Sequence, residues 1–424
     1  MKIIIHAFGS RGDVQPYIAL GKGLKEVGHT VSLNTHSIFE SLVRENDLGF
    51  SPISVDPRQV LIAQAVADMG NNPIKISRWM KDNFKPHLDG IFKETLLAAR
   101  GADLLLISTV AVAGWHVAQK LQIPAIGLIL QPITPTGEFH GSMVAPPPVW
   151  LPLKATYNYF SAKFTNQATF NMLRPLVNES RAKVLDLPPL GASFYWQADA
   201  PTGEAPFICG FSPSVISRPA NWGPAIQIAG YWFLEEAQSY APPSALVDFL
   251  EAGPPPVYIG FGSMVDHERE KVTQLVAAAV RQAGQRAILL GGWGELGSTD
   301  LPDTIFQVES VPHDWLFSRV AAVVHHGGAG TTAAGLRAGK PTVVVPFFGD
   351  QSFWAWRVHQ LGAGPKWIPR KRLTADKLAA AILQAVNDPT VKETARDIGK
   401  RIRSEDGLQV GVELVERFAE SYIP

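Results

Sequence analysis

The sequence has little cysteine, no excess of charge and no long apolar run. Its 424 residues contain one cysteine, Cys209, so no internal disulfide can form and a reducing compartment is expected. Lys+Arg and Asp+Glu both number 38, and this balance gives no positive field that favours nucleic acid. No apolar run approaches the roughly 18 residues that a membrane span needs. We therefore expect a soluble cytoplasmic protein with no nucleic-acid partner and at most peripheral membrane contact.

Short apolar segments alternate with helical ones along the chain. The run IIIHAF after Lys2 suits a parallel strand buried on both faces, and apolar residues then recur at helical spacing up to Gly28. The same alternation returns from residue 257, and the length of the chain also suits two domains. We predict two doubly wound α/β domains with parallel sheets. The predicted ranges are 1–225 for the first domain, 226–250 for a linker, 251–405 for the second domain and 406–424 for a C-terminal helix.

The stretch HHGGAGTT, residues 325–332, follows an apolar strand and leads into a helix. Unpaired N–H groups at a helix N-terminus attract anions, and glycines let a phosphate approach them closely. Gly328, Gly330 and Ala333 also match the dinucleotide fingerprint, with Asp350 further on, so an NAD-dependent dehydrogenase is an alternative. That fingerprint belongs on the first strand of a sheet, and too few residues follow it here to complete one. We therefore favour a phosphate-binding turn late in a second nucleotide domain.

Three motifs together resemble a known family. They are GSRGDVQPYIALGKGL near the N-terminus, VPHDWLF from Val311, and HHGGAGTTAAGLRAGKPTVVVPFFGDQ from His325 to Gln351. In this combination the chain resembles the GT-B glycosyltransferases that use nucleotide sugars, above all the branch of fungal and bacterial sterol glucosyltransferases. More distantly it resembles the glycopeptide-antibiotic glycosyltransferases. The resemblance implies two facing Rossmann-like domains, with the acceptor site in the first, the nucleotide sugar in the second, and the C-terminal helix crossing back to the first.

The resemblance also implies an activity. The protein is expected to be an inverting, metal-independent UDP-glycosyltransferase that moves a hexose, by preference glucose from UDP-glucose, to a hydroxyl group of a hydrophobic acceptor such as a sterol, terpenoid or polyphenol. No cofactor is expected, because the UDP-sugar is a substrate. The absence of an Asp-x-Asp motif agrees with a reaction without metal. Alternatives are the dehydrogenase, a nucleotide-sugar epimerase and a non-catalytic nucleotide- or lipid-binding protein of the same fold.

Asp13 is the predicted catalytic base. A carboxylate in a strand-to-helix loop can take the proton of the acceptor, and GSRGD carries the base in the branch that the chain resembles. The alternative is that Asp13 is only the N-cap of the helix that follows. By resemblance, Ser10, Arg11 and Gly12 face the diphosphate, although Arg11 also suits a solvated surface charge.

The glycine-rich turn is predicted to hold the diphosphate of the donor. Its N–H groups and the helix dipole would stabilise the charge that builds on the leaving nucleotide. The residues assigned to this role are His326, Gly328, Ala329, Gly330, Thr331 and Thr332. Ser263, after the strand at 257, is a second phosphate donor by resemblance, or else an ordinary helix-start serine. We interpret His325 as a core residue at the strand end.

Asp350 and Gln351 are predicted to bind the hexose, since an adjacent acid and amide can accept and donate hydrogen bonds to its hydroxyls. Alternatively, they cap the helix that follows. Val311 would offer backbone hydrogen bonds to the nucleotide base, and Trp293 would line the base pocket or lie in the core. Plant members have a ribose-binding glutamate where this chain has Ala334, so ribose recognition must differ.

The acceptor is expected to contact residues 131–160, which combine several prolines with aromatic residues. By resemblance, loops at this point of the first domain line the acceptor site, and an apolar wall suits a flat hydrophobic alcohol. Phe139 and Trp150 are the predicted lining residues. Packing of these aromatics against their own helix is the alternative.

Overall fold

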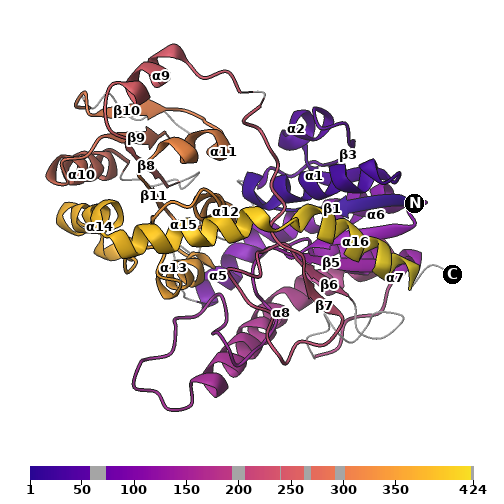
Figure 1. The fold of residues 1–424 in the computed structure, drawn as a ribbon. Coiled ribbons are helices and arrows are strands. Elements are labelled where there is room, and N and C mark those ends of the chain that lie inside the picture. The colour runs from indigo at the N-terminus through magenta and orange to yellow at the C-terminus, as the bar shows by residue number, and fades with distance from the viewer. Residues whose placement is uncertain (58–72, 193–205, 239, 262–268, 292–300, 422–424) are drawn as a thin grey trace. The chain divides into compact units, whose positions relative to one another are not determined.

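A computed structural model of the protein describes residues 1–57, 73–192, 206–238, 240–261, 269–291 and 301–421. The chain divides into two compact units, a first unit of Met1–Leu234 with Asp406–Pro424 and a second unit of Glu235–Glu405. Each unit is built on one parallel sheet flanked by helices (Figure 1). The second unit is therefore inserted into the first along the chain.

The first sheet has the strand order β3-β2-β1-β4-β5-β6-β7, and all its neighbouring strands are parallel. Its strands are β1 (Lys2–His6), β2 (Thr30–His36), β3 (Gly49–Ile53), β4 (Leu104–Ser108), β5 (Ala125–Ile129), β6 (Phe207–Cys209) and β7 (Ile226–Ile228). β7 occupies the start of the stretch for which the sequence predicts a linker. Its Ile226 is buried and pairs with Phe207, so this stretch begins with a strand that completes the first sheet.

Helices of the first unit lie between and after these strands. They are α1 (Arg11–Glu26), α2 (Glu40–Arg44), α5 (Pro73–Trp79), α6 (Lys85–Ala99), α7 (Val112–Leu121), α8 (Lys154–Leu185) and α16 (Gly407–Glu420), with a 3-10 turn at Ser37–Phe39 and a π-helical turn at Met80–Phe84. Although α8 has 32 residues, its composition is polar. In the part of the chain that the structure describes, no helix is both long and apolar enough to cross a membrane.

Alternate residues of β1 enter two different cores. Ile3 and Ile5 pack in a cluster with side chains of α1, α2 and α16, whereas Ile4 packs with side chains of α6, α7 and α8. None of the three isoleucines is more than 2% exposed. A strand that is apolar on both faces is typical of a parallel sheet covered on both sides. This double coverage explains why β1 appears in the sequence as an unbroken apolar run.

Glycines let α16 pack closely against α1 and the end of the first sheet. A Cβ atom at Gly23 would lie 2.9 Å from Val412 Cγ2, and one at Gly411 would lie 2.6 Å from Trp232 Nε1. Trp232 Nε1 also donates a hydrogen bond to the Gly407 carbonyl at 3.1 Å. The buried residues of the apolar stripe on α16 include Val412, Val415 and Ala419. The helix therefore belongs to the core of the first unit.

The second sheet has the order β10-β9-β8-β11-β12 and is also parallel. Its strands are β8 (Val257–Gly260), β9 (Ala287–Leu290), β10 (Ile305–Val308), β11 (Ala322–His325) and β12 (Thr342–Val344). The helices are α9 (Ser244–Glu251), α10 (Arg269–Gln282), α11 (His313–Leu316), α12 (Ala329–Arg337), α13 (Gln351–Gln360), α14 (Ala375–Asn387) and α15 (Pro389–Ser404), with 3-10 turns at Phe317–Arg319 and Arg370–Arg372. Helices α10 and α14 pack on one face of this sheet, and α9 and α11 pack on the other.

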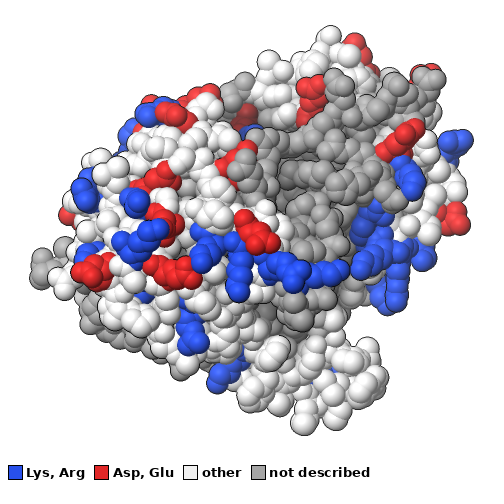
Figure 2. Space-filling view, turned by 180° about the vertical axis from the view of Figure 1, so that it is seen from behind, with Lys and Arg blue, Asp and Glu red and all other residues white. Residues whose placement is uncertain are grey.

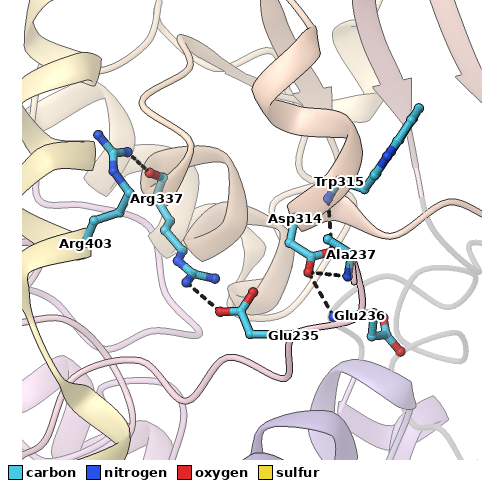
Figure 3. Close-up of polar contacts among 7 residues, drawn as sticks. All are labelled: Glu235, Glu236, Ala237, Asp314, Trp315, Arg337 and Arg403. Carbon is cyan, nitrogen blue, oxygen red and sulfur yellow. Dashed lines mark hydrogen bonds and ion pairs between the residues drawn. The ribbon is translucent and has the colours of Figure 1, made fainter. Parts of the chain in front are cut away.

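Asp314, in the first turn of α11, holds the segment with which the second unit begins. Its Oδ2 atom accepts hydrogen bonds from the backbone N–H groups of Glu236 (2.9 Å) and Ala237 (2.8 Å), as Figure 3 shows. Arg337, the last residue of α12, forms an ion pair with Glu235 at 2.5 Å. Asp314 belongs to the motif VPHDWLF, and its carboxylate fixes the point where the chain enters the second unit.

Candidate functional site

The strand order of each sheet reverses at one point. In the first sheet β1 lies between β2 and β4, and in the second sheet β8 lies between β9 and β11. Connections leave the two neighbouring strands in opposite directions at such a point, so a crevice forms beside their carboxyl ends, where open α/β sheets bind ligands. The predicted residues that follow β1 and β11 lie at these two reversals.

Ser10, not Asp13, caps helix α1. The helix begins at Arg11, with Ser10 as its N-cap and Asp13 as its third residue. Asp13 Oδ2 accepts hydrogen bonds from the backbone N–H and from the hydroxyl of Ser10, both at 2.8 Å. The bond from the Ser10 N–H to the side chain of the third helical residue is that of a capping box, which differs from the N-cap alternative for Asp13. Both bonds reach Oδ2, so Oδ1 is the oxygen that remains to accept a proton.

Gly9 brings the strand end close to the carboxylate of Asp13. Its φ is +130°, and a Cβ atom there would lie 2.6 Å from Asp13 Oδ2. The Gly9 N–H donates to His36 Nε2 at 3.1 Å, and His36 Nδ1 donates to the Val55 carbonyl at 2.7 Å. Burial lowers the pKa of His36, which keeps Nε2 free of a proton and able to accept. No local pattern in the sequence marks His36 as a partner of this turn, so its contact with Gly9 was not predicted.

Burial raises the pKa of Asp13 above its usual value. The hydrogen bonds from Ser10 act in the opposite direction, but their effect is smaller than that of desolvation. A carboxylate with increased proton affinity is better suited to accept a proton near neutral pH than a surface aspartate. Gly12 and Arg11, beside it, are exposed.

His325 shapes the turn after β11. It is fully buried, and its Nδ1 accepts a hydrogen bond from the Gly327 N–H at 2.9 Å. Gly327 has a φ of +96°, and a Cβ there would lie 2.9 Å from the carbonyl of Gln351. The turn therefore needs glycine at this position and lies directly against the start of α13.

The first turn of α12 offers backbone donors. Gly328 is the N-cap, and the first hydrogen bond of the helix runs from the Thr332 N–H to the Gly328 carbonyl at 2.9 Å. The N–H groups of Ala329, Gly330 and Thr331 precede that bond. Gly330 is exposed, and a Cβ atom there would meet nothing within 4 Å. An anion can therefore approach these three N–H groups.

Thr332 differs from its predicted role as a phosphate donor. Its side chain is buried, and its hydroxyl donates to the same Gly328 carbonyl at 2.9 Å. Both donors of Thr332 thus close the first turn of α12. Thr331, one residue earlier, is partly exposed.

His326 lies against the N-terminus of α12. A Cβ atom at Gly328 would lie 2.6 Å from His326 Nε2, so the absence of a side chain there leaves room for the imidazole ring. Burial lowers the pKa of His326 to about 4, so the ring is neutral at physiological pH. Among the residues that the structure describes, its buried Nδ1 has no hydrogen-bond partner. A neutral imidazole that adds one N–H donor to the helix N-terminus suits a phosphate oxygen.

Asp350 and Gln351 follow β12, the neighbour of β11, and begin α13. Asp350 Oδ2 accepts a hydrogen bond from the Trp354 indole at 3.0 Å. Gln351 is buried, and its Oε1 accepts from the N–H groups of Phe347 (2.8 Å) and Phe348 (3.2 Å). The amide oxygen of Gln351 is therefore used to shape its own turn, whereas its NH₂ group keeps its donors.

The remaining predicted residues lie apart from these turns or outside the described residues. The side chain of Val311 is buried, and its backbone N–H and C=O have no hydrogen-bond partner among the residues that the structure describes. Phe139 is buried against Trp222, with their ring centroids 6.2 Å apart, whereas Trp150 is 79% exposed. The residues outside the described ranges are Ser263 and Trp293.

Comparisons with known proteins agree with this architecture. The chain matches the model of the glycosyltransferase family 28 N-terminal domain over residues 3–131. It matches the erythromycin biosynthesis protein CIII-like C-terminal domain over residues 293–413. The solved structure of glycosyltransferase SnogD from Streptomyces nogalater superposes with a TM-score of 0.68 at 20% identity, over 98% of this chain and 100% of that one. Glycosyltransferase VinC, solved with DTDP, gives a TM-score of 0.66 at 19% identity, over 99% and 100%.

The two parallel-sheet units thus have the GT-B fold of these solved structures. Two sterol 3-beta-glucosyltransferases of Arabidopsis thaliana are 38% and 36% identical to the chain, over 96% and 100% of it and over 64% and 69% of their own lengths. A sterol 3-beta-glucosyltransferase of Cryptococcus neoformans is 36% identical over 99% of this chain, which spans 27% of that relative. The chain belongs to the sterol 3-beta-glucosyltransferase family, and the predicted resemblance is confirmed.

Substitution of Gly9 by alanine should disturb Asp13, whereas the same change at Gly28 should not. Both glycines have positive φ, +130° and +97°, but an added Cβ meets Asp13 Oδ2 at Gly9 and nothing within 4 Å at Gly28. We expect each variant to lose about 1–3 kcal/mol of stability through backbone strain. Only Gly9→Ala should also lose most of its glycosyl transfer, measured at a temperature where both variants are folded. Equal specific activities would contradict the proposed importance of the Gly9–Asp13 contact.

Proposed function

We propose that the protein transfers glucose from UDP-glucose to the hydroxyl group of a sterol, with inversion at the anomeric carbon and without a metal ion. The observation that carries this proposal is the 38% and 36% identity to two sterol 3-beta-glucosyltransferases, which extends over 96% and 100% of this chain. Both strand-order reversals carry residues suited to the reaction, a carboxyl group after β1 and a phosphate-type turn after β11. Incubation of the purified protein with UDP-glucose and a panel of sterols, terpenoids and phenols tests it directly.

In the proposed reaction, Asp13 acts as the general base. Its carboxylate takes the proton of the acceptor hydroxyl while the acceptor oxygen forms a bond to C1 of glucose. The bond between C1 and the diphosphate oxygen breaks at the same time, and its electron pair leaves with UDP. Attack on the face opposite to the leaving group inverts the configuration at C1. The raised pKa of Asp13 supports this role, because a base is most effective when its pKa is not far below the working pH.

The N-terminus of α12 would stabilise the leaving diphosphate. The N–H groups of Ala329, Gly330 and Thr331 and the positive end of the helix dipole favour a group that gains negative charge. His326 is neutral and adds a hydrogen-bond donor without a competing proton equilibrium near pH 7. Together these donors supply charge stabilisation that other transferases obtain from a metal ion.

Asp350 and Gln351 are proposed to bind the glucose hydroxyls. Their turn abuts the phosphate-type turn, since an added Cβ at Gly327 would lie 2.9 Å from the Gln351 carbonyl. A sugar attached to a diphosphate on α12 is thus within reach of the start of α13. The NH₂ group of Gln351 and the carboxylate of Asp350 provide a donor and an acceptor side by side.

The position of the glycine-rich turn argues against the dehydrogenase alternative. In dinucleotide-binding domains the glycine fingerprint follows the first strand of the sheet. Here it follows β11, the fourth strand of the second unit in chain order, whereas the first strand of that unit is β8. The turn therefore suits a diphosphate at the strand-order reversal rather than a dinucleotide at the start of a domain.

Removal of divalent metal should leave glucosyl transfer unchanged. The helix N-terminus and His326 would already stabilise the leaving group, so we expect equal rates in the presence and absence of EDTA. The measurement is the initial rate of sterol glucoside formation after dialysis against the chelator. Loss of activity that magnesium or manganese restores would contradict the metal-independent mechanism.

Conservative changes at the start of α13 should separate sugar binding from turn structure. Gln351→Glu keeps an oxygen for the N–H groups of Phe347 and Phe348 but removes the NH₂ donor, and Asp350→Asn keeps an oxygen for Trp354 but removes the charge. A buried hydrogen bond lost from the sugar is worth about 1–3 kcal/mol, so we expect the KM for UDP-glucose to rise roughly tenfold. The Kd for UDP, measured by calorimetry, should stay nearly constant. Equal losses for both ligands would mean that the two residues only support the turn.

Asp13→Asn should abolish the base while retaining the cap. The asparagine oxygen can still accept the Ser10 N–H, so the melting temperature and the affinity for UDP should remain close to those of the parent protein. Turnover of an aliphatic sterol hydroxyl should fall roughly a hundredfold or more, the usual effect of losing a general base. Asp13→Ala should be equally inactive and also less stable by about 1 kcal/mol, since the capping contact is lost. Near-normal turnover by Asp13→Asn would leave Asp13 with a purely structural role.

A further inference from the structure

One segment of the first unit concentrates exposed aromatic side chains. We call residues 143–164 the exposed aromatic segment. It comprises the loop before α8 and the first turns of α8, and it presents large apolar groups to solvent. Trp150 is 79% exposed, Phe160 58% and Phe164 74%. Among the residues that the structure describes, every Phe, Tyr and Trp that is at least 36% exposed lies in this segment. Large contiguous apolar patches on a protein surface mark interaction sites.

The start of α8 is held in place by contacts of its inner face with the loop at residues 137–141. Asn158, on the inner face of α8, donates to the Gly137 carbonyl at 2.9 Å. The Gly141 N–H donates to Ser161 Oγ at 3.1 Å, and a Cβ atom at Gly141 would lie 2.8 Å from Ala162 Cα. These contacts bury one face of the helix against the loop. Phe160 and Phe164, one helical turn apart, lie on the opposite face.

The charges around the segment have one sign. Between residues 139 and 178 the sequence contains no Asp or Glu, and its charged residues are Lys154, Lys163 and Arg174. Lys154 and Lys163 are exposed and stand among the exposed aromatics. In Figure 2 the tip formed by this loop and the start of α8 is white, without the red of acidic atoms. An apolar, aromatic and basic surface without acids complements an anionic lipid surface.

We propose that the exposed aromatic segment docks the protein on an anionic lipid bilayer. Trp150, Phe160 and Phe164 would enter the interface between headgroups and acyl chains, where aromatic side chains are preferred. Lys154 and Lys163 would keep their ammonium groups at the level of the lipid phosphates while their aliphatic stems lie along the apolar surface. A two-fold pairing of this face with a second copy is disfavoured, because it would bring like charges together.

Flotation with vesicles tests the proposal without any glycosyl transfer. The vesicles contain phosphatidylcholine alone or phosphatidylcholine with phosphatidylglycerol, and neither sterol nor sugar donor is present, so the result is independent of the proposed activity. We expect binding to the anionic vesicles, weaker binding to the neutral ones, and a decline as the salt concentration rises. No binding to either vesicle would overturn the proposal.

Surface variants assign the binding to the segment. Phe160→Ser with Phe164→Ser should lower the partition coefficient on both vesicles about tenfold or more, because their apolar burial is lost. Val27→Ser with Leu97→Ser is the matched control, since these residues of the same unit are 44% and 67% exposed, and it should bind as the parent does. Lys154→Gln with Lys163→Gln should weaken binding to anionic vesicles roughly tenfold or more and leave binding to neutral ones unchanged.

Two controls complete the experiment. Circular dichroism and melting temperatures should be the same for all variants, because every substituted side chain is exposed. The proposal is wrong if the phenylalanine variant binds vesicles as well as its matched control. It is also wrong if light scattering finds the parent dimeric and only the phenylalanine variant monomeric, since the face would then be an interface between copies of this chain.

Discussion

Parallel strand pairing is the constraint on which both units depend. In a parallel sheet the carboxyl ends of all strands lie at one edge, so each following helix begins at that edge with its unpaired N–H groups. Helices α1 and α12 begin beside the two reversals of strand order. Parallel strand pairing therefore places the N-termini of α1 and α12 at the carboxyl edges of the two sheets. The candidate residues lie at these N-termini for that reason.

Desolvation has opposite chemical consequences at these two N-termini. At α1 it makes the Asp13 carboxyl more basic, and at α12 it keeps the His326 ring uncharged. In both cases burial disfavours the ionised form. For aspartate the ionised form is the deprotonated carboxylate, so its pKa rises. For histidine it is the protonated imidazolium, so its pKa falls. The same physical effect therefore suits the proposed proton acceptor on one helix and the proposed neutral hydrogen-bond donor on the other.

The sequence predicts those features that repeat locally or follow a strand directly. The apolar runs of β1 and β8 revealed two parallel sheets, and the glycines after His325 revealed a helix N-terminus. Features that depend on contacts distant in the sequence could not be predicted. His36 reaches Gly9 only after β2 has paired with β1, and Gln351 uses its oxygen within its own turn, which hydropathy does not reveal. The alternative interpretation of Asp13 placed the cap there instead of at Ser10, because propensity does not locate the first helical residue so accurately.

The insertion of the second unit into the first has a consequence for biosynthesis. The core of the first unit includes Val412 and Val415 of α16, which the ribosome adds only after the whole of Glu235–Glu405 has been made. During translation the second unit can complete its own sheet and cores at once, whereas the groove of α1 around Gly23 stays uncovered until α16 emerges. The usual vectorial order, in which the N-terminal domain folds first, is thus reversed for the final closing step. Nascent chains stalled before residue 406 should accordingly expose this apolar groove to chaperones.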